Sequence, residues 1–116
     1  MLDKKLEFKD WIKNVVHYRK MSTNELSRID ADDSNLTSLN GIEKYTNLSY
    51  LNISGNRLKT LDGLEKIKNL THLNISFNPI ECLKPLSVHK DLEEIDISST
   101  NLENLDGLLQ FPKLEI

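Results

Sequence analysis

Apolar residues return along this chain at a fixed interval of 22 residues, without an insertion. With Leu48 as position one of a repeat, the same position is again leucine at residues 26, 70, 92 and 114. Positions four and six of each copy are apolar, and the positions between and beside them are mostly polar. This alternation is typical of a strand with one buried face. A constant period of this length predicts a solenoid of stacked copies, because one copy alone cannot bury its apolar edge.

The second half of each copy has a wider spacing, with apolar residues at positions eleven, fourteen, seventeen and twenty, except for His89 at position twenty of the third copy. This pattern predicts a turn followed by a short helical or 3₁₀ segment. Glycine stands at position sixteen in three copies, directly after Asn or Asp, where the chain has to turn tightly. The third full copy has Pro85 there, which suits the first turn of a helix. The glycines are Gly41, Gly63 and Gly107.

The segments "LSYLNISGN" from Leu48 and "LTHLNISFN" from Leu70 give the clearest view of the repeat. Residues 48–58 and 70–80 match the pattern L-x-x-L-x-L-x-x-N-x-L completely, so residues 26–116 resemble the leucine-rich repeat family, with four full copies and the start of a fifth. The resemblance implies an α/β fold: a right-handed solenoid with a concave parallel β-sheet and convex turns or 3₁₀ segments. Two branches fit the repeat length, the leucine-rich regulatory subunit of protein phosphatase 1 and the bacterial internalins.

The resemblance also assigns a structural role to the asparagine at position nine. In the family this side chain forms a ladder that satisfies backbone groups of neighbouring turns. Asn56 and Asn78 are expected to do so here. Ser34 and Thr100 stand at the same position, and their departure from the pattern predicts a weaker ladder in the first and fourth copies.

Residues 1–25 do not follow the repeat and are interpreted as an N-terminal helical cap. Asp3 is expected to begin a helix that runs to about Lys20. A capping-box spacing of Ser22 and Glu25 predicts a second short helical turn. The helix has an apolar face suited to covering the first open edge of the solenoid, and that reading is favoured over a basic amphipathic helix for a membrane surface or a partner. This face comprises Phe8, Trp11, Ile12, Val15 and Tyr18.

Composition and charge bear on the class of partner and on the cellular location. The net charge of −3 gives no electrostatic case for nucleic-acid binding, and no stretch is long and apolar enough for a signal peptide or a membrane span. The single cysteine, Cys82, excludes an internal disulfide and favours a reducing compartment, so a cytoplasmic location is expected. Cys82 itself is expected to be a partly buried structural thiol.

The chain ends at Ile116, just as a fifth strand begins at Leu114. An uncapped edge of this kind would expose core leucines and an unpaired strand. Three explanations are open: the sequence is a fragment of a longer repeat protein, it forms a homo-dimer through this edge, or a partner completes the edge.

The outward positions of the strands are free of the packing constraint that fixes the core, so they can encode recognition. They form columns across the concave sheet, with aromatic residues near the middle and charged residues at the rim, as in many protein-binding hot spots. Tyr50, His72 and Phe77 are predicted to lie together as anchors. The predicted partner-binding residues are Arg28, Asp30, Tyr50, Asn52, His72, Asn74, Phe77, Glu94 and Asp96.

No catalytic constellation emerges, and no enzyme activity, cofactor or metal is predicted. The three histidines fall on different elements, and His89 is expected to be a half-buried packing residue. Asp30, Asp32 and Asp33 give a weak case for a cation site, because no glycine-centred loop accompanies them. The sequence thus favours a protein-binding module, such as an adaptor, regulatory subunit or inhibitor, that presents a rigid concave face. A structural fragment or a homo-oligomer built through the C-terminal edge is the alternative, and a ribonucleoprotein scaffold is a third.

Overall fold

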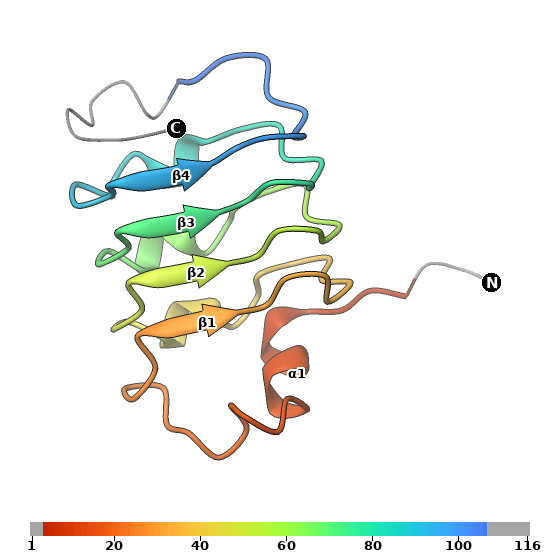
Figure 1. The fold of residues 1–116 in the computed structure, drawn as a ribbon, viewed down its shortest axis with the longest axis vertical. Helices are drawn as coiled ribbons and strands as arrows, with labels where there is room; N and C mark the ends of the chain where they lie inside the picture. The colour runs from red at the N-terminus through yellow and green to blue at the C-terminus, as the bar shows by residue number, and fades with distance from the viewer. Residues whose placement is uncertain (1–3, 107–116) are drawn as a thin grey trace.

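The computed structural model describes residues 4–106, and its central feature is a sheet of four parallel strands in the order in which they occur along the chain. The strands stack one above the other as successive turns of an open solenoid (Figure 1). Pairing is in register at the repeat interval, so that Ile29 faces Leu51, Leu51 faces Leu73, and Leu73 faces Ile95. The strands are β1 (Arg28–Asp30), β2 (Tyr50–Asn52), β3 (His72–Asn74) and β4 (Glu94–Asp96).

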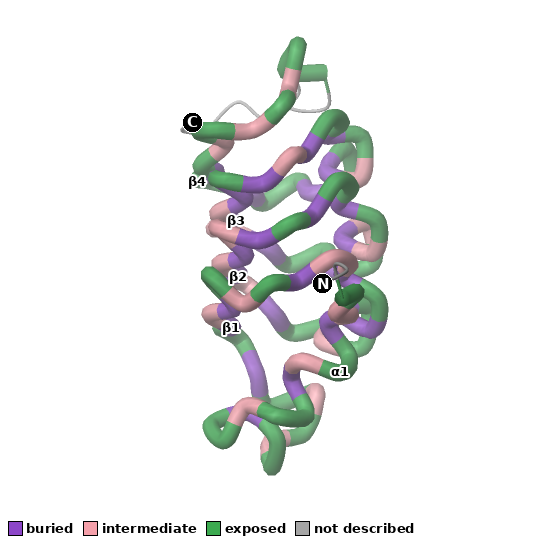
Figure 2. Tube along the Cα trace, turned by 90° about the vertical axis from the view of Figure 1, so that its right-hand side faces the viewer, coloured by how far each residue is buried: buried purple, intermediate pink, exposed green. Residues whose placement is uncertain are grey.

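A single hydrophobic core runs between the sheet and the opposite side of the solenoid, visible as the buried inner positions in Figure 2. Positions one, four and six are buried in each of the first three copies, as the alternation in the sequence predicts. The prediction of a leucine-rich repeat solenoid with a concave parallel sheet is therefore confirmed. Leu114 and Ile116, on which the open-edge interpretation rests, lie outside the described residues.

Within residues 4–106, the side opposite the sheet is formed by three short 3₁₀ helices, η1 (Ile42–Lys44), η2 (Leu64–Lys66) and η3 (Lys84–Leu86). Gly41 and Gly63 precede the first two with φ of 100° and 109°, a region that side chains disfavour. The third begins with proline at its first turn. Gly107 lies outside the described residues.

The asparagines at position nine cross-link the turns that follow the strands. Asn56 accepts hydrogen bonds from the backbone N–H groups of Ser34 and Leu36 and donates to the carbonyl groups of Ala31 and Ile53. Asn78 donates to the Ile53 carbonyl at 2.8 Å and accepts from the Leu58 N–H at 3.0 Å. At the same position of the fourth copy, Thr100 donates to the carbonyl of Ile97.

The N-terminal cap is smaller than predicted. The helix α1 (Phe8–Lys13) has six residues, has Asn14 as its C-cap and is followed by turns rather than by helix to Lys20. Asp3 lies outside the described residues. In the capping-box pair, the Ser22 N–H donates to Glu25 Oε1 at 2.7 Å, which lowers the pKa of Glu25. The Glu25 N–H donates back to the Ser22 carbonyl at 3.1 Å, and these residues form a turn and not a helix.

The cap covers the first coil as the apolar face predicts. Phe8, Ile12 and Tyr18 are buried in the common core, and Trp11 and Val15 pack against it. The backbone joins the first copy as well, because the Phe8 N–H donates to the Ser38 carbonyl at 3.1 Å. At the first strand, the Asp30 N–H donates to the Tyr18 hydroxyl at 2.9 Å, which satisfies a backbone group of the sheet.

Two expectations about single side chains are wrong. Cys82 is exposed rather than partly buried, because its side chain turns toward the Lys84 N–H at the surface, 3.4 Å from Sγ. His89 is fully buried rather than half-buried. Its Nε2 lies 2.7 Å from the Ile67 carbonyl oxygen, and Nδ1 lies 3.3 Å from that of Leu86. The ring therefore holds two coils together by polar contacts and by packing.

Replacing Gly41 by alanine is expected to destabilise the protein by about 2–4 kcal/mol, because the φ is unfavourable and the cap is in the way. A Cβ there would lie 2.5 Å from the Cβ of Lys9 and 3.1 Å from its Cα. Gly63→Ala is the matched control, with a similar φ but a flexible Ile42 methyl group at 3.2 Å. Urea denaturation should show a larger decrease in the free energy of unfolding for Gly41→Ala than for Gly63→Ala. Equal decreases would contradict the close approach of the cap to Gly41.

Candidate functional site

A row of stacked side chains crosses the concave sheet at position three. The guanidinium carbon of Arg28 lies 3.9 Å from the centre of the Tyr50 ring, and that ring stacks on His72 with centroids 6.1 Å apart and an interplanar angle of 23°. His72 Nε2 in turn lies 3.9 Å from Glu94 Oε2. The row runs from a cation through two rings to an anion, and it arises because the strand register places these residues side by side.

The first end of the row is closed by an ion pair. Arg28 donates from Nε to Asp30 Oδ2 at 3.0 Å and from Nη2 to Oδ1 at 3.4 Å, the two-point geometry that fits a guanidinium to a carboxylate. This bond raises the pKa of Arg28. Arg28 is thus held between a carboxylate and an aromatic face, both supplied by the chain itself.

Position five holds polar side chains that brace the backbone. Asn52 and Asn74 each accept through Oδ1 from the N–H and hydroxyl of the serine two residues later, with N–H distances of 3.1 Å and 3.0 Å. Asp96 does the same with Ser98. These three predicted binding residues therefore carry a structural role at the end of each strand, which the sequence interpretation missed. The spacing, Asn or Asp followed two residues later by Ser in three copies, was the available signal.

Asp96 should give the fourth copy a weak pH dependence that the second and third copies lack. The bonds from Ser98 lower the pKa of Asp96, so its contribution to stability is present above the unfolded pKa and is lost as pH falls through the folded pKa. At neutral pH this is at most about 1 kcal/mol, since the group is exposed. Asp96→Asn, which introduces the amide that the third copy has at Asn74, should keep the bonds and remove the dependence between about pH 5 and pH 3.

Urea titrations at several pH values measure this difference. Asp96→Ala is the control that removes both the bonds and the charge. An Asp96→Asn protein whose stability falls with acid as steeply as the wild type would contradict the assignment.

Position eight is left-handed in all four copies. Asp33, Gly55, Phe77 and Ser99 have φ values of 50°, 65°, 55° and 53°. The first three donate their N–H groups to the position-seven carbonyl of the following coil, so they form a column beside the sheet. Phe77 is 64% exposed, although a left-handed backbone is unfavourable for a bulky side chain. Its ring makes no ring contact with Tyr50 or His72 among the described residues, so the structure does not bring the three predicted anchors together.

Replacing Phe77 by glycine is expected to stabilise the protein by about 0.5–1 kcal/mol, because the strain of the left-handed backbone exceeds the extra entropy of glycine in the unfolded chain. The exposed ring gives up little burial. Phe77→Ala is the matched control, since it removes the ring and keeps the strain. Chemical denaturation should rank glycine above alanine, and the reverse order would mean that the left-handed backbone costs less than the extra entropy of glycine in the unfolded chain.

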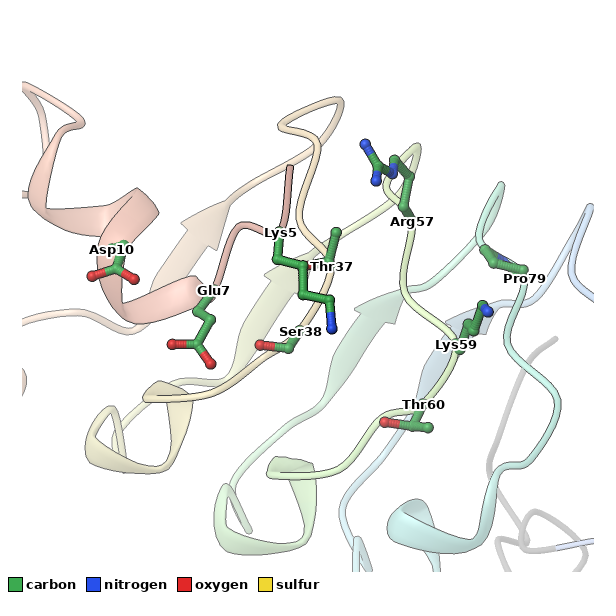
Figure 3. A pocket seen from close by; sticks show the side chains of 9 residues that line it. All are labelled: Lys5, Glu7, Asp10, Thr37, Ser38, Arg57, Lys59, Thr60 and Pro79. Atoms are coloured by element: carbon green, nitrogen blue, oxygen red, sulfur yellow. The ribbon is translucent and has the colours of Figure 1, made fainter. Parts of the chain in front are cut away.

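A polar groove lies elsewhere on the molecule, at repeat positions ten to thirteen (Figure 3). It runs between the N-terminal segment and the turns after β1 and β2, and no predicted partner-binding residue lines it. Its charges have both signs, and one of them, Glu7, accepts a hydrogen bond from the Asn40 amide and lies 3.6 Å from Lys9. Its lining residues are Lys5, Glu7, Asp10, Thr37, Ser38, Arg57, Lys59, Thr60 and Pro79.

The described part of the chain has neither a cluster of metal ligands nor a membrane-spanning helix. Over residues 4–106 no group of three His, Cys, Asp or Glu side chains is arranged to hold a metal ion, and this includes Asp30, Asp32 and Asp33. Within the same residues, no helix has the length and apolar character needed to cross a membrane.

Comparison with known proteins supports the repeat assignment. The family model for leucine-rich repeats, in two copies, matches residues 46–88. This range contains β2, β3 and the two ladder asparagines, so these residues are leucine-rich repeats in sequence as well as in fold. A comparison with curated protein sequences gives no significant match.

Solved structures share the fold. An internalin C2 from Listeria monocytogenes superposes with a TM-score of 0.75 at 21% identity, over 77% of this chain and 39% of the other. A second internalin of Listeria monocytogenes, inlF, gives a TM-score of 0.60 at 20% identity, over 90% of this chain and 40% of the other. The chain thus spans about two fifths of the length of these structures. The chain has the leucine-rich repeat fold, a common protein–protein interaction module.

Proposed function

We propose that this protein binds a protein partner through the concave face of its sheet, as an adaptor, regulatory subunit or inhibitor. The observation that carries the proposal is the row from Arg28 through Tyr50 and His72 to Glu94. Its members are fixed by the strand register and by one another, so little side-chain entropy is lost when a partner binds. Aromatic and arginine side chains are also those that most often dominate binding energy at interfaces.

The test begins with capture of proteins from a cell lysate by the full chain, followed by titration calorimetry with each purified candidate. The double variant Tyr50→Ala, His72→Ala should weaken binding at least ~30-fold, the loss expected for a hot spot of about 2 kcal/mol. Val88→Ala, an exposed apolar residue beyond η3, is the matched control and should bind as the wild type does. Equal affinities for both variants would contradict a binding site in this row.

Self-association through the C-terminal edge is the alternative function, and the same samples can be used to test it. Light scattering at several concentrations should report a monomer if the concave face is the functional surface and the C-terminal edge is not. The expectation of a cytoplasmic location stays a prediction, and cell fractionation of the tagged protein in its own host would check it.

A further inference from the structure

The column at position eight offers a second binding feature beside the stacked row. Here the side chain of Asp33 leans over Gly55: a Cβ added to Gly55 would overlap the Asp33 carboxylate, with Cγ at 3.0 Å. Gly55 separates Asp33 from Phe77 in the column, since their N–H groups bond successive coils. Because Gly55 has no side chain, none stands in this column between the Asp33 carboxylate and the exposed Phe77 of the next coil.

The chain itself shows what such a pair can bind. Arg28 is held by the Asp30 carboxylate on one side and the face of Tyr50 on the other. A guanidinium suits this geometry because its edge donates two hydrogen bonds while its flat face stacks on a ring. Asp33 and Phe77 provide the same two kinds of partner, one from each side of Gly55.

The surrounding charge favours a cation as well. In the four full copies, the strands and their flanking residues at positions two to eight hold six of the eighteen carboxylates and one of the fifteen Lys and Arg residues. This part of the chain therefore has a net charge of −5, and the rest has +2. A surface of one sign attracts groups of the other sign and speeds their encounter. The acidic residues are Asp30, Asp32, Asp33, Glu93, Glu94 and Asp96.

The backbone gives a separate reason to regard Phe77 as functional. Its left-handed φ is unfavourable for a large side chain, and glycine occupies the same position in the preceding copy. Its ring is mostly exposed and so contributes little to the core. Strain that brings no packing benefit is found most often where a side chain serves in binding.

We propose that Asp33, Gly55 and Phe77 form a site for an arginine side chain of the protein partner, with the guanidinium stacked on Phe77 and bonded to the Asp33 carboxylate. The inference rests on the proposed function, because it names the chemistry that the partner presents to the concave face. It predicts a partner whose binding segment is basic and contains an arginine at this point of contact.

The first test uses N-acetyl-arginine-N-methylamide as the probe and the full chain of 116 residues, followed by amide NMR shifts. The amide signals of Asp33, Gly55 and Phe77 are expected to shift until the site is saturated. Binding of the probe should be weaker at high salt, because salt screens the charges. The neutral isostere N-acetyl-citrulline-N-methylamide should leave them unchanged. Asp33→Asn and Phe77→Leu should each weaken arginine binding about threefold, as expected for one exposed ion pair or one cation–ring contact. Both side chains are exposed, and the spectra themselves report whether each variant is folded.

Equal shifts with citrulline, or arginine binding that both variants leave unchanged, would overturn the proposal. The affinity of the variants for the protein partner distinguishes a failure of the arginine site from a failure of the proposed function. Loss of affinity in the Tyr50 and His72 double variant, with full affinity in Asp33→Asn and Phe77→Leu, would retain the concave surface and reject the arginine site. Loss of partner affinity in all of these variants, together with no amide shifts on adding the citrulline compound, supports both the arginine site and the concave binding face.

Discussion

Replacing Phe8 by alanine is expected to destabilise the protein by about 3–5 kcal/mol, the range for removing a large aromatic side chain from a core. Phe8 is fully buried, and its ring contacts both Trp11 and Tyr45 at centroid distances of 5.7 Å and 5.6 Å. Tyr45 belongs to the first copy of the repeat, so Phe8 joins the cap to the solenoid. Stability in a solenoid comes from contacts between neighbouring coils. The first coil should therefore be destabilised directly, and the second coil through its contacts with the first.

Urea denaturation of Phe8→Ala measures the total loss, and hydrogen exchange locates it. The N–H of Lys9, which donates to the Asn40 carbonyl at 2.9 Å, should exchange faster in the variant than in the wild type. Val16→Ala is the matched control, because Val16 is 72% exposed and should change stability by less than about 0.5 kcal/mol. A Phe8→Ala protein as stable as the control would mean that the N-terminal segment is not a cap, and its reading as a basic amphipathic helix would gain support.

The repeat could be predicted from sequence because its physics is local and recurs four times. The strand at positions three to five follows from the alternation of apolar and polar residues, and the turn at Gly41 and Gly63 follows from a glycine after Asn or Asp. Each copy repeats the same signal, so errors in one copy are corrected by the next. The 3₁₀ helices η1 and η2 begin directly after those glycines.

The cap occurs once, and its length was wrong for a reason that lies in tertiary contacts. The apolar spacing from Phe8 to Tyr18 fits one continuous helix, yet the helix ends after Lys13. Tyr18 then reaches the first strand with its hydroxyl group, which accepts from the N–H of Asp30. A helical pattern in the sequence cannot reveal that a backbone group elsewhere needs this partner.

The concave columns were placed correctly, but their contacts could not be predicted from spacing alone. Register brings Arg28, Tyr50, His72 and Glu94 into one row. Phe77 lies beyond the end of β3 with a left-handed backbone, and among the described residues its ring makes no ring contact with that row. Side-chain rotamers and backbone handedness decide such contacts, and neither is encoded in the apolar period.

Replacing Asn56 by alanine is expected to destabilise the protein by about 3 kcal/mol or more, because several buried backbone groups lose their partners at once. Asn56 is 7% exposed and satisfies two N–H groups through Oδ1, at 3.0 Å and 2.9 Å. Its Nδ2 bonds the Ala31 and Ile53 carbonyls at 2.9 Å and 2.8 Å. Asn52→Ala is the matched control, since Asn52 is only half-buried and braces one serine of its own turn. Thermal and urea unfolding should show a clearly smaller loss for the control.

Asn56→Asp tests the amide group itself. A carboxylate keeps the acceptor for the Ser34 and Leu36 N–H groups, but it sets a second oxygen against the carbonyl groups of Ala31 and Ile53. This repulsion should raise the pKa of the new carboxyl group in the folded state. A raised folded pKa gives stability that is present below the unfolded pKa and lost as pH rises through the folded value. The deficit of Asn56→Asp relative to the wild type should therefore grow from pH 4 to pH 7, while that of Asn56→Ala stays nearly constant. A deficit of Asn56→Asp that does not change with pH would mean that the asparagine amide does not donate to these carbonyls.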